Sequence, residues 1–176
     1  RTRNLTVVEK DRRLVPVLEK ELAGRDMTHV QIINQDVLRQ DIPAIAGDHP
    51  LVVIGNLPYN ISSQILFKLV KDRRQVKRAF LMFQKELAER ISASPGGKSW
   101  SRLAAVVQYA AKVSTVTDVG PSNFFPRPDV DSTVLKFDFF EPGELNDDQE
   151  QFLFNIIKAA FSKRRKSLKN SMAGGE

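Results

Sequence analysis

The sequence predicts an α/β fold with a largely parallel sheet, and two features of its 176 residues support this. Short apolar, β-branched runs alternate with stretches whose apolar residues recur at helical spacing, as in βαβ units with right-handed crossovers. Two later runs, 113–119 and 130–140, are joined by an irregular loop, so we expect them to pair antiparallel at one edge of the sheet. The first four strand-like runs are residues 5–9, 30–34, 51–54 and 78–83.

Amphipathic helices are predicted between and after these strands, at residues 10–22, 61–69, 85–91 and 103–111, and residues 149–169 are predicted to form one helical stretch or two. Pro16 fits the first helix only within its first turn, where a missing N–H costs little. Asn60 or Ser62 is available to cap the second helix. The segment that contains Pro43 and Gly47 is predicted to be a loop.

Composition narrows the class of protein. The chain has 41% hydrophobic and 27% charged residues, and no apolar run approaches the roughly 18 residues of a membrane span. It has no cysteine, and its start does not resemble a secretory signal. We therefore expect a cytoplasmic protein without disulfides or thiolate metal sites. The net charge of +6 favours a polyanionic partner, a class that includes nucleic acids.

Polar side chains follow three successive predicted strands: Glu9, Asp36 and Asn56. Ligands of open α/β sheets bind beyond the carboxyl ends of the strands, where an acid commonly accepts hydrogen bonds from ribose hydroxyls. Glu9 fits that role, and Asp36 fits acceptance from an adenine amine. Each acid alone could equally be solvated or cap the next helix. No Gly-x-Gly phosphate loop occurs, and the chain starts where a second strand would be expected.

The run 51–54 is predicted to be a buried strand, and the motif Asn56-Leu57-Pro58-Tyr59 follows it. This motif resembles the Asn-Pro-Pro-Tyr motif of enzymes that methylate exocyclic amines of bases. The lone pair of such an amine is conjugated into the ring, so acceptors at the Asn56 side chain and the Leu57 carbonyl would make it more available. Tyr59 would stack on the flipped base. An ordinary proline turn with a packed tyrosine is the alternative.

Four segments in order, residues 56–66, 83–90, 124–132 and 159–170, closely resemble the KsgA-type ribosomal RNA adenine dimethyltransferases. The resemblance implies a Rossmann-like class I S-adenosylmethionine-dependent methyltransferase sheet. It also implies dimethylation of two adjacent adenines near the 3′ end of small-subunit rRNA, linked to ribosome biogenesis. The partner would be a pre-assembled small ribosomal subunit, and the enzyme a monomer.

The resemblance also implies roles for individual residues. Glu9 matches the ribose-binding acid, Asp36 the acid that binds the cofactor adenine, and Asn56 a residue that also lies near the cofactor. Asn56, Leu57 and Tyr59 match the target-amine motif. Phe124 matches an aromatic ring that sandwiches the target base. Without the resemblance, Phe124 and Phe125 could equally be core residues of the last hairpin. A basic run is expected to contact RNA phosphates through Lys163, Arg164, Arg165, Lys166 and Lys169.

The predicted domains are a catalytic methyltransferase domain, residues 1–140, and the start of a helical RNA-binding domain, residues 141–176. Compared with the family pattern, the N-terminal arm and the glycine-rich cofactor loop are missing. The first strand of the family's sheet is also expected to be absent. We therefore expect residues 1–176 alone to bind S-adenosylmethionine weakly or not at all.

Three other functions stay open at this point. The first is a non-catalytic RNA-binding ribosome assembly factor. The second is a large-subunit rRNA adenine methyltransferase of the antibiotic-resistance type, which the basic segment fits poorly. The third, a DNA adenine methyltransferase, leaves the basic segment unexplained.

Overall fold

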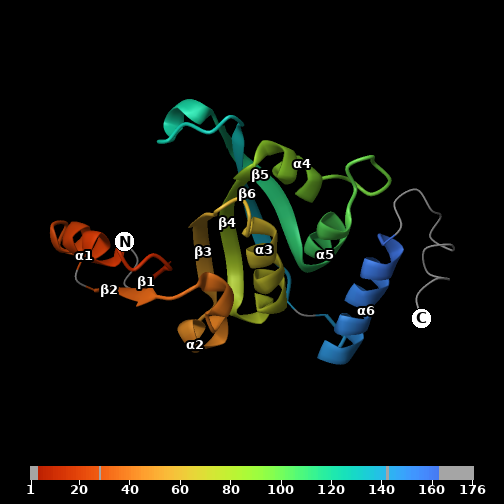
Figure 1. The fold of residues 1–176 in the computed structure, drawn as a ribbon. Helices are drawn as coiled ribbons and strands as arrows, with labels where there is room; N and C mark the ends of the chain where they lie inside the picture. Colours follow the sequence, from red (N-terminus) through yellow and green to blue (C-terminus); the bar gives the residue numbers. More distant parts are fainter. Residues whose placement is uncertain (1–3, 28, 142, 163–176) are drawn as a thin grey trace. The chain divides into compact units, whose positions relative to one another are not determined.

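The computed structural model describes residues 4–27, 29–141 and 143–162 (Figure 1). The chain divides into two compact units, Arg1–Asp48 and His49–Glu176, and each is described by itself. No helix in the described ranges has the length and apolar character needed to cross a membrane.

The first unit is built on two parallel strands, β1 (Leu5–Glu9) and β2 (Val30–Asn34), with Glu9 opposite Asn34. Helix α1 (Val15–Ala23) connects them, so this is a βαβ unit. Pro16 lies in the first turn of α1, as predicted, because only there is its missing N–H harmless. The helix is shorter than predicted, since residues 12–14 form a turn before it.

A short 3₁₀ helix, η1 (Val37–Arg39), and a short helix, α2 (Ile42–Ala46), complete this unit. The segment around Pro43 was predicted to be a loop, and that prediction is wrong. The Asp41 side chain accepts a hydrogen bond from the Ala44 backbone N–H at 3.1 Å, which starts the helix with the proline in its first turn.

The second unit contains a four-stranded sheet in the order β3-β4-β6-β5. β3 and β4 are parallel, whereas β6 is antiparallel to both β4 and β5, with β5 at the edge. The predicted antiparallel pairing of the last two strands is therefore confirmed. The described strands form two sheets where one was predicted, because no described ladder joins β1 or β2 to the other four. The strands are β3 (Leu51–Asn56), β4 (Val76–Gln84), β5 (Ala111–Val119) and β6 (Ser132–Phe139).

The helices of this unit follow the predicted apolar periodicity. Their bounds, with two 3₁₀ turns, are α3 (Ser62–Lys71), η2 (Arg73–Gln75), α4 (Lys85–Ile91), α5 (Arg102–Ala110), η3 (Pro121–Asn123) and α6 (Asp147–Ala160). The predicted cap of α3 is wrong. Ile61 occupies the cap position without a side-chain hydrogen bond, and Ser62 instead donates to the Tyr59 carbonyl at 3.0 Å.

The core of the second unit lies on one face of its sheet. Alternate residues of β4, namely Ala79, Leu81 and Phe83, are completely buried, as period-two side chains on a covered face should be. The rings of Phe83 and Phe137 meet edge to face with centroids 6.0 Å apart. α3, α4 and α5 supply further buried apolar residues: Ile65, Leu66, Leu69, Val70, Ala88, Ile91, Leu103, Ala104, Val106, Val107 and Ala110.

The prediction that residues 51–54 form a buried strand is wrong for half of its side chains. Val52 is 56% exposed and Ile54 is 81% exposed. Both alternate with Leu51 and Val53, so they share one face of β3, and the core lies on the other face.

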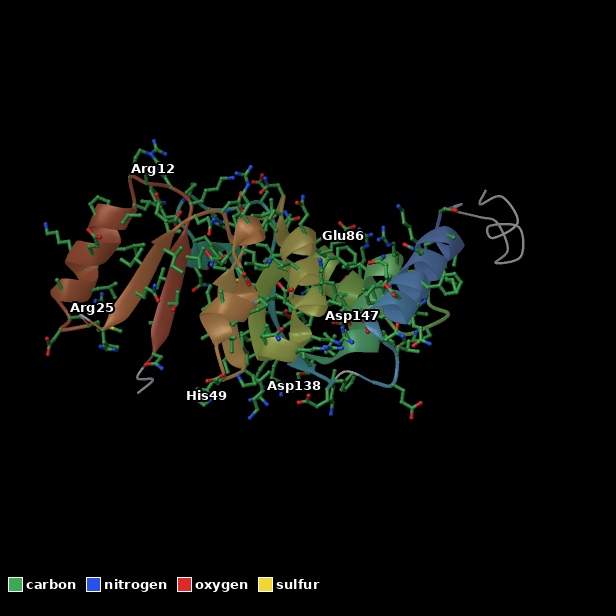
Figure 2. All side chains as sticks on the ribbon, turned by 90° about the horizontal axis from the view of Figure 1, so that it is seen from below. Arg12, Arg25, His49, Glu86, Asp138 and Asp147 are labelled. Carbon is green, nitrogen blue, oxygen red and sulfur yellow. The ribbon has the colours of Figure 1, made fainter. Side chains whose placement is uncertain are left out.

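Helix α6 docks on the second unit through a buried ion pair. Both guanidinium nitrogens of Arg73 donate to the Glu150 carboxylate, one of them at 2.8 Å, and the side chains are only 7% and 14% exposed. Tyr109 of α5 donates to the same carboxylate at 3.1 Å and packs edge to face on Phe154. Asp147, labelled at the start of α6 in Figure 2, pairs with Arg74 at 3.2 Å on the surface.

Candidate active site

Glu9 is the last residue of β1, and Asp36 lies two residues beyond the end of the parallel strand β2. One oxygen of Glu9 accepts from the Asp11 backbone N–H at 2.7 Å, and no described residue donates to the other. Asp36 caps η1 by accepting from the Leu38 N–H at 3.0 Å, and its second oxygen pairs with the Lys10 ammonium at 2.8 Å. The Lys10 hydrogen bond, followed by that from Leu38, lowers the pKa of Asp36. Both carboxylates therefore lie at the same end of the β1–β2 pair, where they can accept hydrogen bonds from a ligand.

Asn56 is the last residue of β3, and its exposed side-chain amide bonds to no other described residue. Gly55 precedes it within β3. A Cβ at this position would lie 2.7 Å from Leu57 Cδ2 and 3.3 Å from Leu81 Cδ2. The glycine thus leaves room for the Leu57 side chain to lie against the strand.

The Tyr59 ring is 38% exposed and is held at both ends of the residue. Its hydroxyl shares a hydrogen bond with the Ser132 hydroxyl at 3.1 Å, and its carbonyl accepts from Ser62. Ser132 and Ser62 are almost completely buried, so the contacts are protected from water. The alternative of a tyrosine packed away in the core does not describe this residue, because more than a third of it is exposed.

The loop 120–131 between β5 and β6 carries Phe124 and Phe125. The strand ends Val119 and Gln84 both lie opposite Ser132, so this loop is at the same end of the sheet as Asn56 (Figure 1). Phe124 is half-buried and Phe125 is fully exposed, and neither belongs to the buried core. The core interpretation of these two rings is therefore not supported.

Three contacts fix the ends of this loop, and none of them was predicted. The Lys85 N–H donates to the Asp131 carbonyl at 2.9 Å, Thr133 donates to Asp118 at 2.7 Å, and Lys85 Nζ lies 3.7 Å from the Asp118 carboxylate. The Thr133 hydrogen bond, then the Lys85 charge, lowers the pKa of Asp118. Ser132 itself lies within a segment that the family resemblance had identified, but the partner of its hydroxyl is 73 residues away.

The predicted site residues are therefore grouped in two sets. Glu9 and Asp36 belong to the first unit, and Asn56, Leu57, Tyr59 and Phe124 belong to the second. The basic residues Lys163, Arg164, Arg165, Lys166 and Lys169 lie outside the described residues, so their RNA contacts remain a prediction.

A family model described as "Ribosomal RNA adenine dimethylase" matches residues 1–175. The chain belongs to this family. Dimethylase family members depend on S-adenosylmethionine, and their Rossmann-like class I methyltransferase fold is the one predicted for this chain.

Curated relatives carry the name ribosomal RNA small subunit methyltransferase A. The chain is 54% identical to the protein from Desulforapulum autotrophicum, covering 99% of this chain and 61% of the relative. It is 40% identical to the protein from Syntrophotalea carbinolica, covering 97% of this chain and 63% of that protein. The chain thus spans about 60% of the length of these relatives.

Solved structures agree with the fold of the dimethylase family. A dimethyladenosine transferase from Plasmodium falciparum matches with a TM-score of 0.82 and 32% identity, covering 96% of this chain and 58% of that one. The 23S rRNA methyltransferase ErmE matches with a TM-score of 0.75 and 23% identity over 98% of this chain and 67% of that one, which shows a shared fold.

The acceptors of the first unit fit the adenosine half of S-adenosylmethionine. The unoccupied oxygen of Glu9 suits ribose hydroxyls, and the Asp36 carboxylate suits an exocyclic amine. Lys10 is 75% exposed on its side chain, so it is free to swing away from Asp36. The described residues offer no comparable glycine-rich cradle for the methionine half.

Proposed function

We propose that the protein carrying this chain dimethylates the exocyclic amines of two adjacent adenines near the 3′ end of small-subunit rRNA. The observation that carries the proposal is the exposed Asn56 amide at the carboxyl end of β3, which bonds to no other described residue and precedes Tyr59 in the motif. The family membership of the chain supports an enzyme over a purely structural RNA-binding protein.

The protein has to make the exocyclic amine of adenine, a poor nucleophile, react with a methyl donor. An adenine amine donates its lone pair into the ring, so acceptors for its two hydrogens raise the electron density on nitrogen. The Asn56 side-chain oxygen and the Leu57 carbonyl supply these acceptors, and the accessible face of Tyr59 stacks on the base. No strong general base is required, since the proton leaves after the nitrogen has become positively charged.

The cofactor would be held at its adenosine end by Glu9 and Asp36, with Asn56 near its reactive end. S-adenosylmethionine supplies an electrophilic methyl group when it is bound. The residues of this chain contribute position and orientation, which is where catalysis of an in-line transfer mainly comes from. Phe124 would close the second face of the base, 65 residues beyond Tyr59 in the chain but at the same end of the sheet.

The remaining parts of the proposal concern the RNA. Residues 1–140 would form the catalytic domain and residues 141–176 the start of a helical RNA-binding domain, whose basic run contacts phosphates. The substrate would be a pre-assembled small subunit in the cytoplasm, and the enzyme would act as a monomer. α6 is held to the catalytic unit by Arg73 and Glu150, so this domain would begin from a fixed helix.

Methyl transfer to undermethylated small subunits tests the proposal, with a protein that has the length of the relatives and carries this sequence. Asn56→Ala should reduce transfer by at least about 100-fold, as loss of one polarising contact does in other enzymes. Asn155→Ala, an exposed amide on α6, is the control and should be fully active.

Binding of small subunits without any transfer by the parent protein would favour the assembly-factor alternative. Transfer to large-subunit rRNA alone would favour the resistance-type alternative. An active Asn56→Ala variant would contradict the role assigned to the motif.

A further inference from the structure

Phe125 is a fully exposed aromatic ring in the part of the chain that the structure describes. Its exposed fraction is 103%, against half-burial of the adjacent Phe124, and it forms no ring contact with any described aromatic residue. Single exposed apolar side chains are common on protein surfaces, so exposure alone decides nothing. What matters here is where this ring lies and what surrounds it.

The ring belongs to a loop that is tied to the target motif. Ser132, immediately after the loop, holds the Tyr59 hydroxyl at 3.1 Å. The Asp131 carbonyl accepts from the Lys85 N–H at 2.9 Å, and Asp118, before the loop, accepts from Thr133 at 2.7 Å. Both ends of the loop are therefore anchored beside the carboxyl ends of β3 and β4, where Asn56 lies.

The charges of the loop suit contact with a base better than contact with the phosphate backbone. Arg127 is exposed in this loop, but Asp129 and Asp131 are exposed as well. Two carboxylates against one guanidinium make a poor phosphate site. An exposed aromatic ring in a loop that also carries a single arginine is instead what single-stranded RNA-binding surfaces use to stack unpaired bases.

We propose that Phe125 stacks on the nucleobase next to the adenine that occupies the target motif. Phe124 and Phe125 would then serve two consecutive bases, the first ring closing the target pocket and the second holding the neighbour outside it. This inference rests on the proposed function, because it takes an unpaired RNA segment as the ligand. Phe125 is a positioning residue for that segment and contacts no reacting atom.

The experiment uses the full-length protein and a small-subunit RNA hairpin with 2-aminopurine at the position next to a target adenine. Stacking on a ring quenches 2-aminopurine fluorescence. We expect binding of the wild-type protein to quench it, and Phe125→Ala to abolish the quenching and weaken affinity at least about fivefold, the lower end for base–aromatic stacking. Phe125→Tyr should restore both signals, whereas Phe125→Leu should not.

Phe140→Ala is the matched control, since this ring is 49% exposed at the opposite end of β6 and should leave both signals unchanged. Unchanged quenching in Phe125→Ala, or quenching and affinity of Phe125→Leu equal to those of the wild-type protein, would overturn the inference. Unaltered thermal unfolding of Phe125→Ala would show that the loss is local.

The two proposals fail in different ways. If the wild-type protein transfers no methyl group but Phe125→Ala still loses quenching, the proposed function is wrong and the stacking role stands. If transfer is robust and depends on Asn56 while Phe125→Ala quenches normally, only the stacking role is wrong.

Discussion

Replacing Arg73 with methionine should destabilise the second unit by about 3 kcal/mol, because the largely buried Glu150 carboxylate loses its charged partner and both hydrogen bonds from it. Arg73 is 7% exposed, and it gives Glu150 two hydrogen bonds while a third goes to the Val70 carbonyl at 3.2 Å. After the change only Tyr109 donates to the carboxylate. Removing one partner of a buried pair typically costs about 3–5 kcal/mol, and the partial exposure of Glu150 places this pair at the lower end.

Urea unfolding followed by the fluorescence of Trp100, the single tryptophan of the chain, measures the effect. Glu150→Leu should cost a similar amount, and the double variant Arg73→Met/Glu150→Leu should be far less destabilised than the sum of the two. Arg74→Met is the control. Its pair with Asp147 is 55% and 89% exposed, so the change should cost less than about 1 kcal/mol.

A coupling energy below about 0.5 kcal/mol between Arg73 and Glu150 would refute this reasoning, since distant independent sites show no more than that. It would mean that α6 is held by its apolar contacts alone. A large effect of Arg74→Met would also contradict it, because burial would then not be what separates the two pairs.

Three further predictions follow from the site and its surroundings. Burial raises the pKa of Glu150, but the hydrogen bonds and charge of Arg73 outweigh it and lower the pKa overall. The ionised carboxylate therefore stabilises the folded state fully above about pH 4.3, and this stabilisation is lost as the pH falls further. The melting temperature of Glu150→Gln should accordingly vary less with pH below about 4.3 than that of the wild-type protein. Gly55→Ala should cost about 1 kcal/mol in urea unfolding, the lower end for overpacking, because its Cβ would meet the end of the flexible Leu57 side chain at 2.7 Å, whereas Gly120→Ala, with nothing within 4 Å, should be nearly neutral. Tyr59→Phe should lower methyl transfer by up to about tenfold through the lost hydrogen bond to Ser132, and Ser132→Ala should match it, with no further loss in the double variant; additive losses would show that the two hydroxyls act separately.

Local patterns predicted most of the fold. The bounds of α4 were predicted to the residue, and β2 and the antiparallel β5–β6 pair were also correct, because their periodicity and the intervening loop are local signals. α2 was missed because five residues are too few to show a helical period, and its main sequence signal is the N-terminal cap Asp41. The exposure of Ile54 was missed because a run of apolar residues does not say which faces of its sheet are covered.

The candidate site residues were proposed from residue types at strand ends, whereas the contacts that hold them were not predicted. Asn56 and Tyr59 were proposed from a four-residue motif at a strand end, which needs no tertiary information. The Ser132 contact with Tyr59 joins residues 73 positions apart, and the Lys10 pair with Asp36 joins residues 26 apart. Such contacts depend on strand order and register, which composition and spacing do not specify.

Asn56 and Leu57 are proposed to hold an adenine by its exocyclic amine, and nucleoside analysis of small-subunit rRNA after reaction with the full-length protein tests this role. We expect N6,N6-dimethyladenosine at two adjacent positions with the wild-type protein and at least about 100-fold less with Asn56→Ala. Methylation of a ring nitrogen, or an unchanged yield from Asn56→Ala, would contradict it.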